Sequence, residues 1–159
     1  MFAYLYVILS TFTIYRPPVH NVETLSLQEL QSKTLHPDSD TLYIVNFWAT
    51  WCKPCIKELP FFENAGTKFA NKPVKILLVS LDMLSDIHKV DQFVQSNDLR
   101  NEVFLLQAGN PDHWINAIDH SWSGAIPATA FYKAGKKIRF HEGDFNQQEL
   151  FTLIQSITK

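Results

Sequence analysis

The chain contains two cysteines, and only two residues separate them in the segment WCKPC of residues 51–55. Just before them, Leu42–Trp48 (LYIVNFW) is an almost unbroken apolar run, as expected for a strand buried on both faces. After them, apolar residues recur every three or four positions, the spacing of an amphipathic helix: Ile56, Leu59, Phe62, Ala65 and Phe69. The cysteine pair therefore lies where a buried strand passes into a helix, which favours folds that pack helices against a sheet.

The rest of the chain continues this alternation of strands and helices. The further expected elements are a short helix beginning after Ser26 in a capping box with Glu29, a buried strand over residues 74–81, an amphipathic helix over 87–94, a short strand over 102–107, a helix over Pro111–Ile118, a hairpin of 128–133 and 137–141, and a last helix capped by Asn146 and Glu149. This order predicts an α/β sandwich in which helices flank a central sheet of parallel and antiparallel strands.

Composition limits both the size of the protein and its partners. A chain of 159 residues, 46% of them hydrophobic, is enough for one domain with a sizeable core and too short for two. Lys and Arg number 14 against 16 Asp and Glu, so there is no basic excess and we expect no nucleic-acid partner. The chain has no Gly-rich dinucleotide loop, so we expect no nicotinamide or flavin cofactor.

The amino-terminal residues 1–15 (MFAYLYVILSTFTIY) carry no charge. The run is short of the roughly 20 apolar residues of a transmembrane helix and is closer to the apolar region of a secretory signal. The match is partial, because no Lys or Arg precedes the run and no A-x-A cleavage pattern follows it. A strand or helix packed on the domain is the alternative. We expect a signal-like or anchor-like segment and linker at residues 1–20, a domain at residues 21–159, and membrane contact only through the first segment.

The spacing of the two cysteines suits redox chemistry. At the start of a helix, free backbone N–H groups and the macrodipole favour an anion, so Cys52 is expected as a thiolate. In such motifs the thiol pKa falls to roughly 3.5–7.5. Cys55, one turn further on, is expected to be more buried. Cys52 would then attack a substrate disulfide, and Cys55 would resolve the mixed disulfide by attacking Cys52.

Other uses of a cysteine pair fit less well. A structural zinc site usually needs four ligands, and no His pair at zinc-finger spacing accompanies the two cysteines. Haem attachment requires a His directly after the second cysteine, but Ile56 stands there. The six histidines form no spaced cluster, so no metal site is predicted. An inert structural disulfide remains possible, although the placement between strand and helix argues against it.

Residues 45–60 (VNFWATWCKPCIKELP) resemble the active-site segment of the thioredoxin superfamily, specifically of the TlpA/ResA-like extracytoplasmic thiol–disulfide reductases. Residues 122–129 (WSGAIPAT) resemble the loop of that superfamily whose proline is cis and faces the cysteines. The resemblance covers about residues 22–159. It implies a thioredoxin-like sandwich and the reduction of disulfides outside the cytoplasm, in the bacterial periplasm or on a membrane facing it.

The resemblance also assigns roles to single residues. Pro127 matches the cis-proline, and Ile126 matches the residue whose backbone can pair with an extended client. Trp51 matches the tryptophan beside the attacking cysteine, and Glu58 matches the glutamate typical of the TlpA/ResA branch. We therefore expect Trp51, Ile126 and Pro127 to contact substrate.

One position departs from thioredoxin itself. Thioredoxin has a buried Asp six residues before the first cysteine, where this chain has Asn46, and an amide does not exchange protons at neutral pH. Glu58 becomes the candidate for proton handling at Cys55. Taken without the family, Glu58 reads as a solvated helix residue.

These observations predict a thiol–disulfide oxidoreductase that acts through Cys52, Cys55 and Glu58. Its partners would be client proteins with disulfides or thiols, and an upstream dithiol protein that supplies electrons. The alternative is a non-catalytic binding module that holds a client at the groove near Pro127. A peroxidase of the same superfamily is a weaker reading, because those enzymes lack the paired WCxxC arrangement and place a Thr before the reactive cysteine.

Overall fold

The computed structural model describes residues 22–159 of the chain, so the expected signal or anchor segment at residues 1–20 lies outside the described residues. The elements are β1 (Glu23–Leu25), α1 (Leu27–Thr34), β2 (Leu42–Trp48), α2 (Lys53–Lys68), β3 (Val74–Ser80), a 3₁₀ turn (Leu84–Asp86), α3 (Ile87–Ser96), β4 (Glu102–Leu106), α4 (Pro111–Ile118), β5 (Ala128–Lys133), β6 (Lys136–Glu142) and α5 (Gln147–Ile157). In this part of the chain no helix is both long and apolar enough to cross a membrane.

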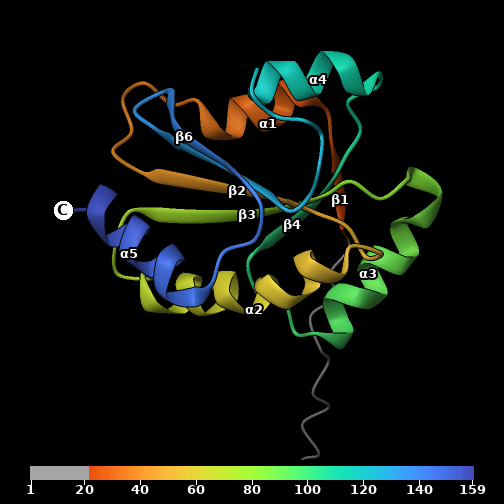
Figure 1. The fold of residues 1–159 in the computed structure, drawn as a ribbon, viewed down its shortest axis with the longest axis horizontal. Coiled ribbons are helices and arrows are strands. Elements are labelled where there is room, and N and C mark those ends of the chain that lie inside the picture. Colours follow the sequence, from red (N-terminus) through yellow and green to blue (C-terminus); the bar gives the residue numbers. More distant parts are fainter. Residues whose placement is uncertain (1–21) are drawn as a thin grey trace, which may run out of the picture.

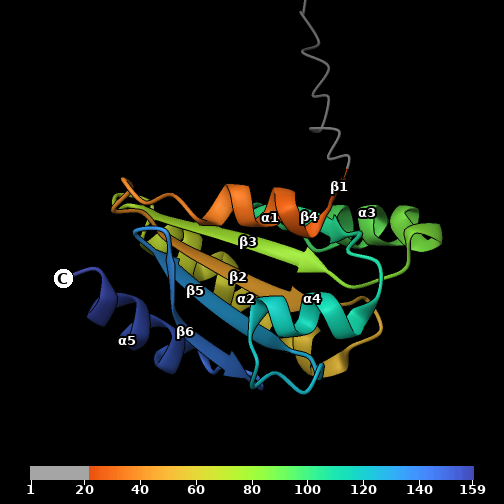
Figure 2. The same cartoon turned by 90° about the horizontal axis from the view of Figure 1, so that it is seen from above.

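The strands form one mixed sheet in the order β1-β4-β3-β2-β5-β6. The first four of these run parallel to one another, whereas β5 pairs antiparallel with β2, and β6 pairs antiparallel with β5. Helices α1 and α4 cover one face of the sheet, and α2, α3 and α5 cover the other (Figures 1 and 2). The predicted α/β sandwich with a mixed sheet flanked by helices is thus confirmed.

Strand β2 lies inside the sheet and contributes to both cores. Successive side chains of a strand point to opposite faces, so Ile44 and Trp48 pack in the core under α2, α3 and α5. Val45 and Phe47 pack in the core under α1 and α4. Burial on both faces explains why this segment reads as a continuous apolar run. The carboxyl end of β2 leads directly to the cysteines, so the most buried strand positions the site.

Two elements were not predicted, β1 and the 3₁₀ turn at Leu84–Asp86. Each is three residues long, too short to show a periodicity. Both predicted capping boxes are present: Ser26 accepts from the Glu29 N–H at 3.2 Å, and Asn146 accepts from the Glu149 N–H at 3.0 Å.

Candidate active site

The two cysteines are joined by a disulfide at the amino terminus of α2, with their Cα atoms 5.3 Å apart. Cys52 is the N-cap residue of the helix, and its Sγ accepts a hydrogen bond from the backbone N–H of Cys55 at 3.3 Å. Cys55 is fully buried, whereas Cys52 is 5% exposed. Pro54 fits in the first turn because no intrahelical donor is needed there. The helix start therefore supplies the environment that stabilises a thiolate at Cys52.

The proline loop lies beside the cysteines. The Ile126–Pro127 peptide bond is cis, as the resemblance implies. The Ile126 carbonyl oxygen lies 3.7 Å from Cys52 Sγ, so a Cys52 thiol would have an acceptor within reach after reduction. Two anchors hold this loop: the Trp122 indole N–H donates to the Ala125 carbonyl at 2.8 Å, and the Ser123 hydroxyl donates to Glu142 at 2.6 Å. The structure thus brings together Cys52 and a loop 74 residues further along the chain.

The tryptophans near the site differ in exposure. The Trp51 side chain is 67% exposed directly beside Cys52, where an incoming molecule can reach it. Trp48 is fully buried, as expected for the last residue of the apolar run Leu42–Trp48. Trp122 is also buried, and its ring packs against Phe47 and Phe140. It supports the proline loop from within and does not line an open groove.

Glu58 is buried, so the reading of this residue as a solvated helix position is wrong. Its carboxyl group accepts two hydrogen bonds: the Asn46 side-chain amide donates to Oε1 at 2.7 Å, and the backbone N–H of Phe145 donates to Oε2 at 2.8 Å. Burial raises the pKa of Glu58 from its usual value near 4.5 to about 7, the two hydrogen bonds oppose that rise, and the charge of Asp144 adds to it. A carboxyl group with this pKa can both take up and release a proton at neutral pH.

Sequence reasoning missed the partners of Glu58. Asn46 is fully buried on β2 and also donates to the hydroxyl of Thr129 on β5, at 3.2 Å. Its own carbonyl oxygen Oδ1 has no hydrogen-bond partner among the described residues. The strand alternation is the signal that could have found Asn46, because it places this residue on the face that α2 covers. Thr129 meets Asn46, and Phe145 meets Glu58, only through the tertiary structure.

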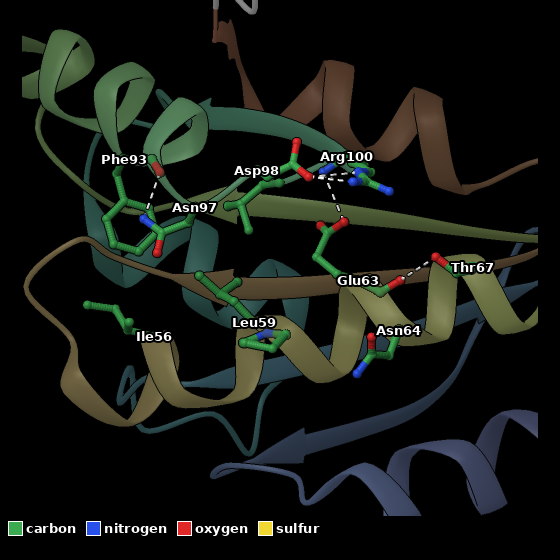
Figure 3. Close-up of a pocket in the computed structure, with 11 residues that line it drawn as sticks. Ile56, Leu59, Glu63, Asn64, Thr67, Phe93, Asn97, Asp98 and Arg100 are labelled. Atoms are coloured by element: carbon green, nitrogen blue, oxygen red, sulfur yellow. Dashed lines mark hydrogen bonds and ion pairs between the residues drawn. The ribbon is translucent and has the colours of Figure 1, made fainter.

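A separate surface groove of about 300 Å³ runs between α2 and the end of α3 (Figure 3). Ile56 and Phe93 line its apolar end, and Glu63, Asp98 and Arg100 line its polar end. The Glu63 carboxylate accepts from the backbone N–H of Arg100 at 2.9 Å, which ties α2 to the segment after α3. Neither cysteine lines this groove, so it is distinct from the disulfide site. Within residues 22–159 no three His, Cys, Asp or Glu side chains are grouped to hold a metal ion.

The sheet order, the helices on both faces and a CxxC disulfide at a helix N-terminus define a thioredoxin-fold protein with a paired-cysteine site. Residues 18–141 match the family model described as the AhpC/TSA family. The chain belongs to this family.

Curated relatives agree with this assignment. The thiol-disulfide oxidoreductase ResA of Bacillus thuringiensis subsp. konkukian is 34% identical over 114 residues, which cover 72% of this chain and 62% of that protein. The thioredoxin-like protein YneN of Bacillus subtilis is 29% identical over 92 residues, covering 57% of this chain and 49% of that protein. The matched part of the chain thus spans less than two thirds of the length of these relatives.

Solved structures show the same fold. A thioredoxin-related protein from Neisseria meningitidis serogroup B superposes with a TM-score of 0.64 at 21% identity, covering 75% of this chain and 86% of that one. StoA from Bacillus subtilis superposes with a TM-score of 0.57 at 21% identity, covering 77% and 86%. A secreted Mycobacterium tuberculosis disulfide oxidoreductase, described as homologous to E. coli DsbE, superposes with a TM-score of 0.58 at 18% identity. The match covers 77% of this chain and 84% of that one. The predicted thioredoxin-like fold is confirmed.

Proposed function

We propose that this protein is a thiol–disulfide oxidoreductase that reduces disulfides of client proteins through a Cys52–Cys55 dithiol/disulfide cycle. The observation that carries the proposal is the disulfide at the N-terminus of α2, with Cys55 enclosed and Cys52 beside the Ile126 carbonyl. The relatives named thiol-disulfide oxidoreductase support it.

The cycle proceeds through two exchanges. In the reduced protein the Cys52 thiolate attacks one sulfur of a client disulfide, the client S–S bond breaks, and the other client sulfur leaves as a thiolate. The Cys55 sulfur then attacks Cys52 Sγ, the mixed disulfide breaks, and the second client thiolate leaves. The client gains two electrons and the cysteine pair loses two. An upstream dithiol protein restores the pair by the same exchange in the opposite direction.

Glu58 handles the proton in the second exchange. Cys55 is buried, so its thiol needs an acceptor inside the protein before it can attack. The ionised Glu58 carboxylate, three residues further along α2, takes that proton. It returns the proton to Cys55 when the upstream donor reduces the disulfide. A pKa near 7 keeps both forms of Glu58 populated at neutral pH.

The client lies along the surface formed by Trp51, Ile126 and Pro127. An extended client segment pairs with the backbone at Ile126 as a short added strand, next to the sulfur that it must reach. The exposed Trp51 ring supplies apolar contact on the other side of Cys52. This arrangement recognises the client mainly through its backbone, so it suits clients of different sequence.

The site of action that we propose is outside the cytoplasm, in the bacterial periplasm or on a membrane facing it, within the TlpA/ResA-like branch. The uncharged apolar run of residues 1–15 supports this location, with residues 1–20 as a signal or anchor and residues 21–159 as the domain. A fusion of residues 1–20 to a reporter enzyme that is active only after export tests it. Export of the reporter is expected, and an inactive reporter contradicts the assignment.

Insulin reduction by dithiothreitol tests the activity. The wild-type protein is expected to accelerate the reaction, and Cys52→Ser is expected to abolish the acceleration. A non-catalytic binding module would instead bind a client peptide without accelerating its reduction. Binding without turnover by the wild-type protein would therefore refute the oxidoreductase assignment.

A further inference from the structure

Asp82 is a buried carboxylate that the proposed thiol chemistry does not use. It lies two residues beyond Ser80, the last residue of β3, and is 5% exposed. A buried charge is unfavourable unless hydrogen bonds compensate it. Asp82 accepts three: from the Ser80 hydroxyl at 2.7 Å, from the Thr50 backbone N–H at 2.9 Å and from the Thr50 hydroxyl at 2.6 Å. Two of the three come from one residue on a different loop.

Thr50, which makes two of these bonds, lies close to the cysteine site. Thr50 lies between the end of β2 and the N-cap of α2, and Trp51 and Cys52 follow it directly. The last residue pair of the β2–β3 ladder is Trp48 with Ser80. Beyond it, the segments that follow β2 and β3 are no longer paired as strands. The Asp82–Thr50 bonds therefore continue the connection between β2 and β3 past the end of the sheet, up to the site.

The exposed Trp51 directly follows the residue that this connection holds. Cys52 is held by its own interactions, because it caps α2 and its backbone N–H donates to the Ala49 carbonyl at 3.1 Å. Trp51 is 67% exposed, so little packing orients its side chain. The bond from the Cys52 N–H to the Ala49 carbonyl closes a turn whose central residues are Thr50 and Trp51. The direction of Trp51 therefore follows the position of this turn, and Asp82 holds the turn through the backbone N–H and the side-chain hydroxyl of Thr50.

We propose that Asp82 is a positioning residue, which fixes Thr50 so that Trp51 is presented to a client beside Cys52. The inference rests on the proposed oxidoreductase function, since it assigns a task within client binding. It does not assign Asp82 any contact with the reacting sulfurs. The expected consequence is an effect on the KM for protein clients that leaves the intrinsic reactivity of Cys52 in place.

The test compares Asp82→Ala with Asp82→Asn in insulin reduction. Asp82→Ala removes all the acceptors and is expected to raise KM about tenfold, the effect of losing a charge-assisted hydrogen bond. Asp82→Asn is expected to stay near wild type, because its amide oxygen can accept from the Thr50 N–H while its NH₂ donates to the Thr50 hydroxyl. Asp86→Asn is the control for charge, because Asp86 pairs with Lys89 at 2.6 Å on the same stretch of chain.

A second variant keeps the test decisive if Asp82→Ala does not fold. Thr50→Val keeps the shape and the N–H but removes the hydroxyl, so it is expected to raise KM several-fold, whereas Thr50→Ser keeps both donors and is expected to restore it. Alkylation of reduced Cys52 by iodoacetamide is expected to stay within about twofold of wild type in every variant, because the α2 N-terminus is unchanged.

The outcomes separate the two proposals. An unchanged KM in Asp82→Ala and Thr50→Val overturns the positioning role while the oxidoreductase function stands. If KM rises equally in Asp82→Asn, the effect comes from the lost charge, and the positioning role is overturned as well. Slowed alkylation of Cys52 also overturns it, because the effect would then come from Cys52 itself. A wild-type protein that reduces no insulin refutes the function, whatever the variants do.

Discussion

The two cysteines are chemically identical, and their surroundings make them different. Cys52 lies at the N-cap of α2 and keeps a small accessible area, while Cys55 is enclosed one turn further on. A client sulfur can reach the first and not the second. The direction of the proposed cycle, attack by Cys52 and resolution by Cys55, follows from this difference in access.

Trapping experiments test that direction. In Cys55→Ser, Cys52 still attacks but no thiol resolves the adduct, so mixed disulfides with clients are expected to accumulate on non-reducing gels after alkylation. Cys52→Ser is the matched variant, because it also leaves a single cysteine, and it is expected to trap little. Equal trapping by both variants would contradict the assigned roles.

Asn46 is expected to tune the proton chemistry of Glu58. Asn46→Leu keeps the branched shape and the number of side-chain heavy atoms but removes the donor to Glu58 Oε1. One of the two hydrogen bonds that oppose the effect of burial is then lost, so the pKa of Glu58 rises further above 7. The corresponding inflection in the pH profile of insulin reduction is expected to move up by about one unit, the equivalent of one hydrogen bond to a charged group.

Two companion variants make this result interpretable. Thr129→Val removes a partner of Asn46 but keeps the bond to Glu58, so the inflection is expected to stay near its wild-type position. Glu58→Gln is expected to lack the inflection altogether. If the profile of Glu58→Gln matches that of wild type, Glu58 takes no part in the proton transfer.

Among the secondary-structure elements, α5 connects the site to the core. The residue before its N-cap, Phe145, donates its backbone N–H to Glu58. Further along the helix, Leu150 and Ile154 pack in the same core as Leu59 of α2. The start of α5 thus holds one of the two hydrogen bonds on the Glu58 carboxylate.

Removing the cap of α5 is expected to cost stability. Asn146→Ala deletes the acceptor for the Glu149 N–H and is expected to lower the free energy of unfolding by about 1 kcal/mol, measured by urea denaturation. Gln148→Ala is the control, because Gln148 is exposed in the same turn and its side chain donates to the hydroxyl of Thr152. An equal loss of unfolding free energy in the two variants would show that the capping bond does not stabilise the fold.

The elements also show what sequence reasoning can reach. The strand at Leu42–Trp48 and the helix at Pro111–Ile118 have the predicted bounds, because an apolar run and an initial proline are local signals. Strand β1 was missed because its three residues become a strand only by pairing with β4. Local signals therefore predicted the main elements but not those that exist through pairing alone.

The same limit applies within the site. The disulfide of Cys52 and Cys55 follows from a spacing of three residues. The burial of Glu58 did not follow, because charged side chains are rarely placed inside a core. Its partners Asn46 and Phe145 lie 12 and 87 residues away, and Asp82 lies 32 residues from Thr50. Such pairs are set by sheet register and helix packing, which a single sequence does not display.

For the domain as a whole, Glu58 makes stability depend on pH. Its pKa in the folded, oxidised protein is about 7, above the usual value near 4.5 of the unfolded chain. Between these two values the folded state holds more protons than the unfolded state, so the free energy of unfolding falls as pH rises. At pH values below 4.5 or above about 7, Glu58 adds no pH dependence to the free energy of unfolding.

Urea denaturation of the oxidised protein between pH 4.5 and 7 measures this effect. Relative to Glu58→Gln, the wild-type protein is expected to lose roughly 3 kcal/mol across the window. The variant serves as the reference because it cannot ionise at this position. Parallel pH dependences of the two proteins would mean that Glu58 titrates near its ordinary value.

The two edges of the sheet bear on how the domain would behave beside the client chains that we propose it reduces. An open strand edge is a template on which other strands can add, and this is how aggregates grow. Here one edge is β1, only three residues long, and the other is β6, where Lys137 and Arg139 flank Ile138, its one exposed large apolar side chain. Short length and positive charge make both edges poor templates. In the proposed cycle, a client chain could therefore pair with the backbone beside Cys52 while neither edge of the sheet favours the growth of an aggregate.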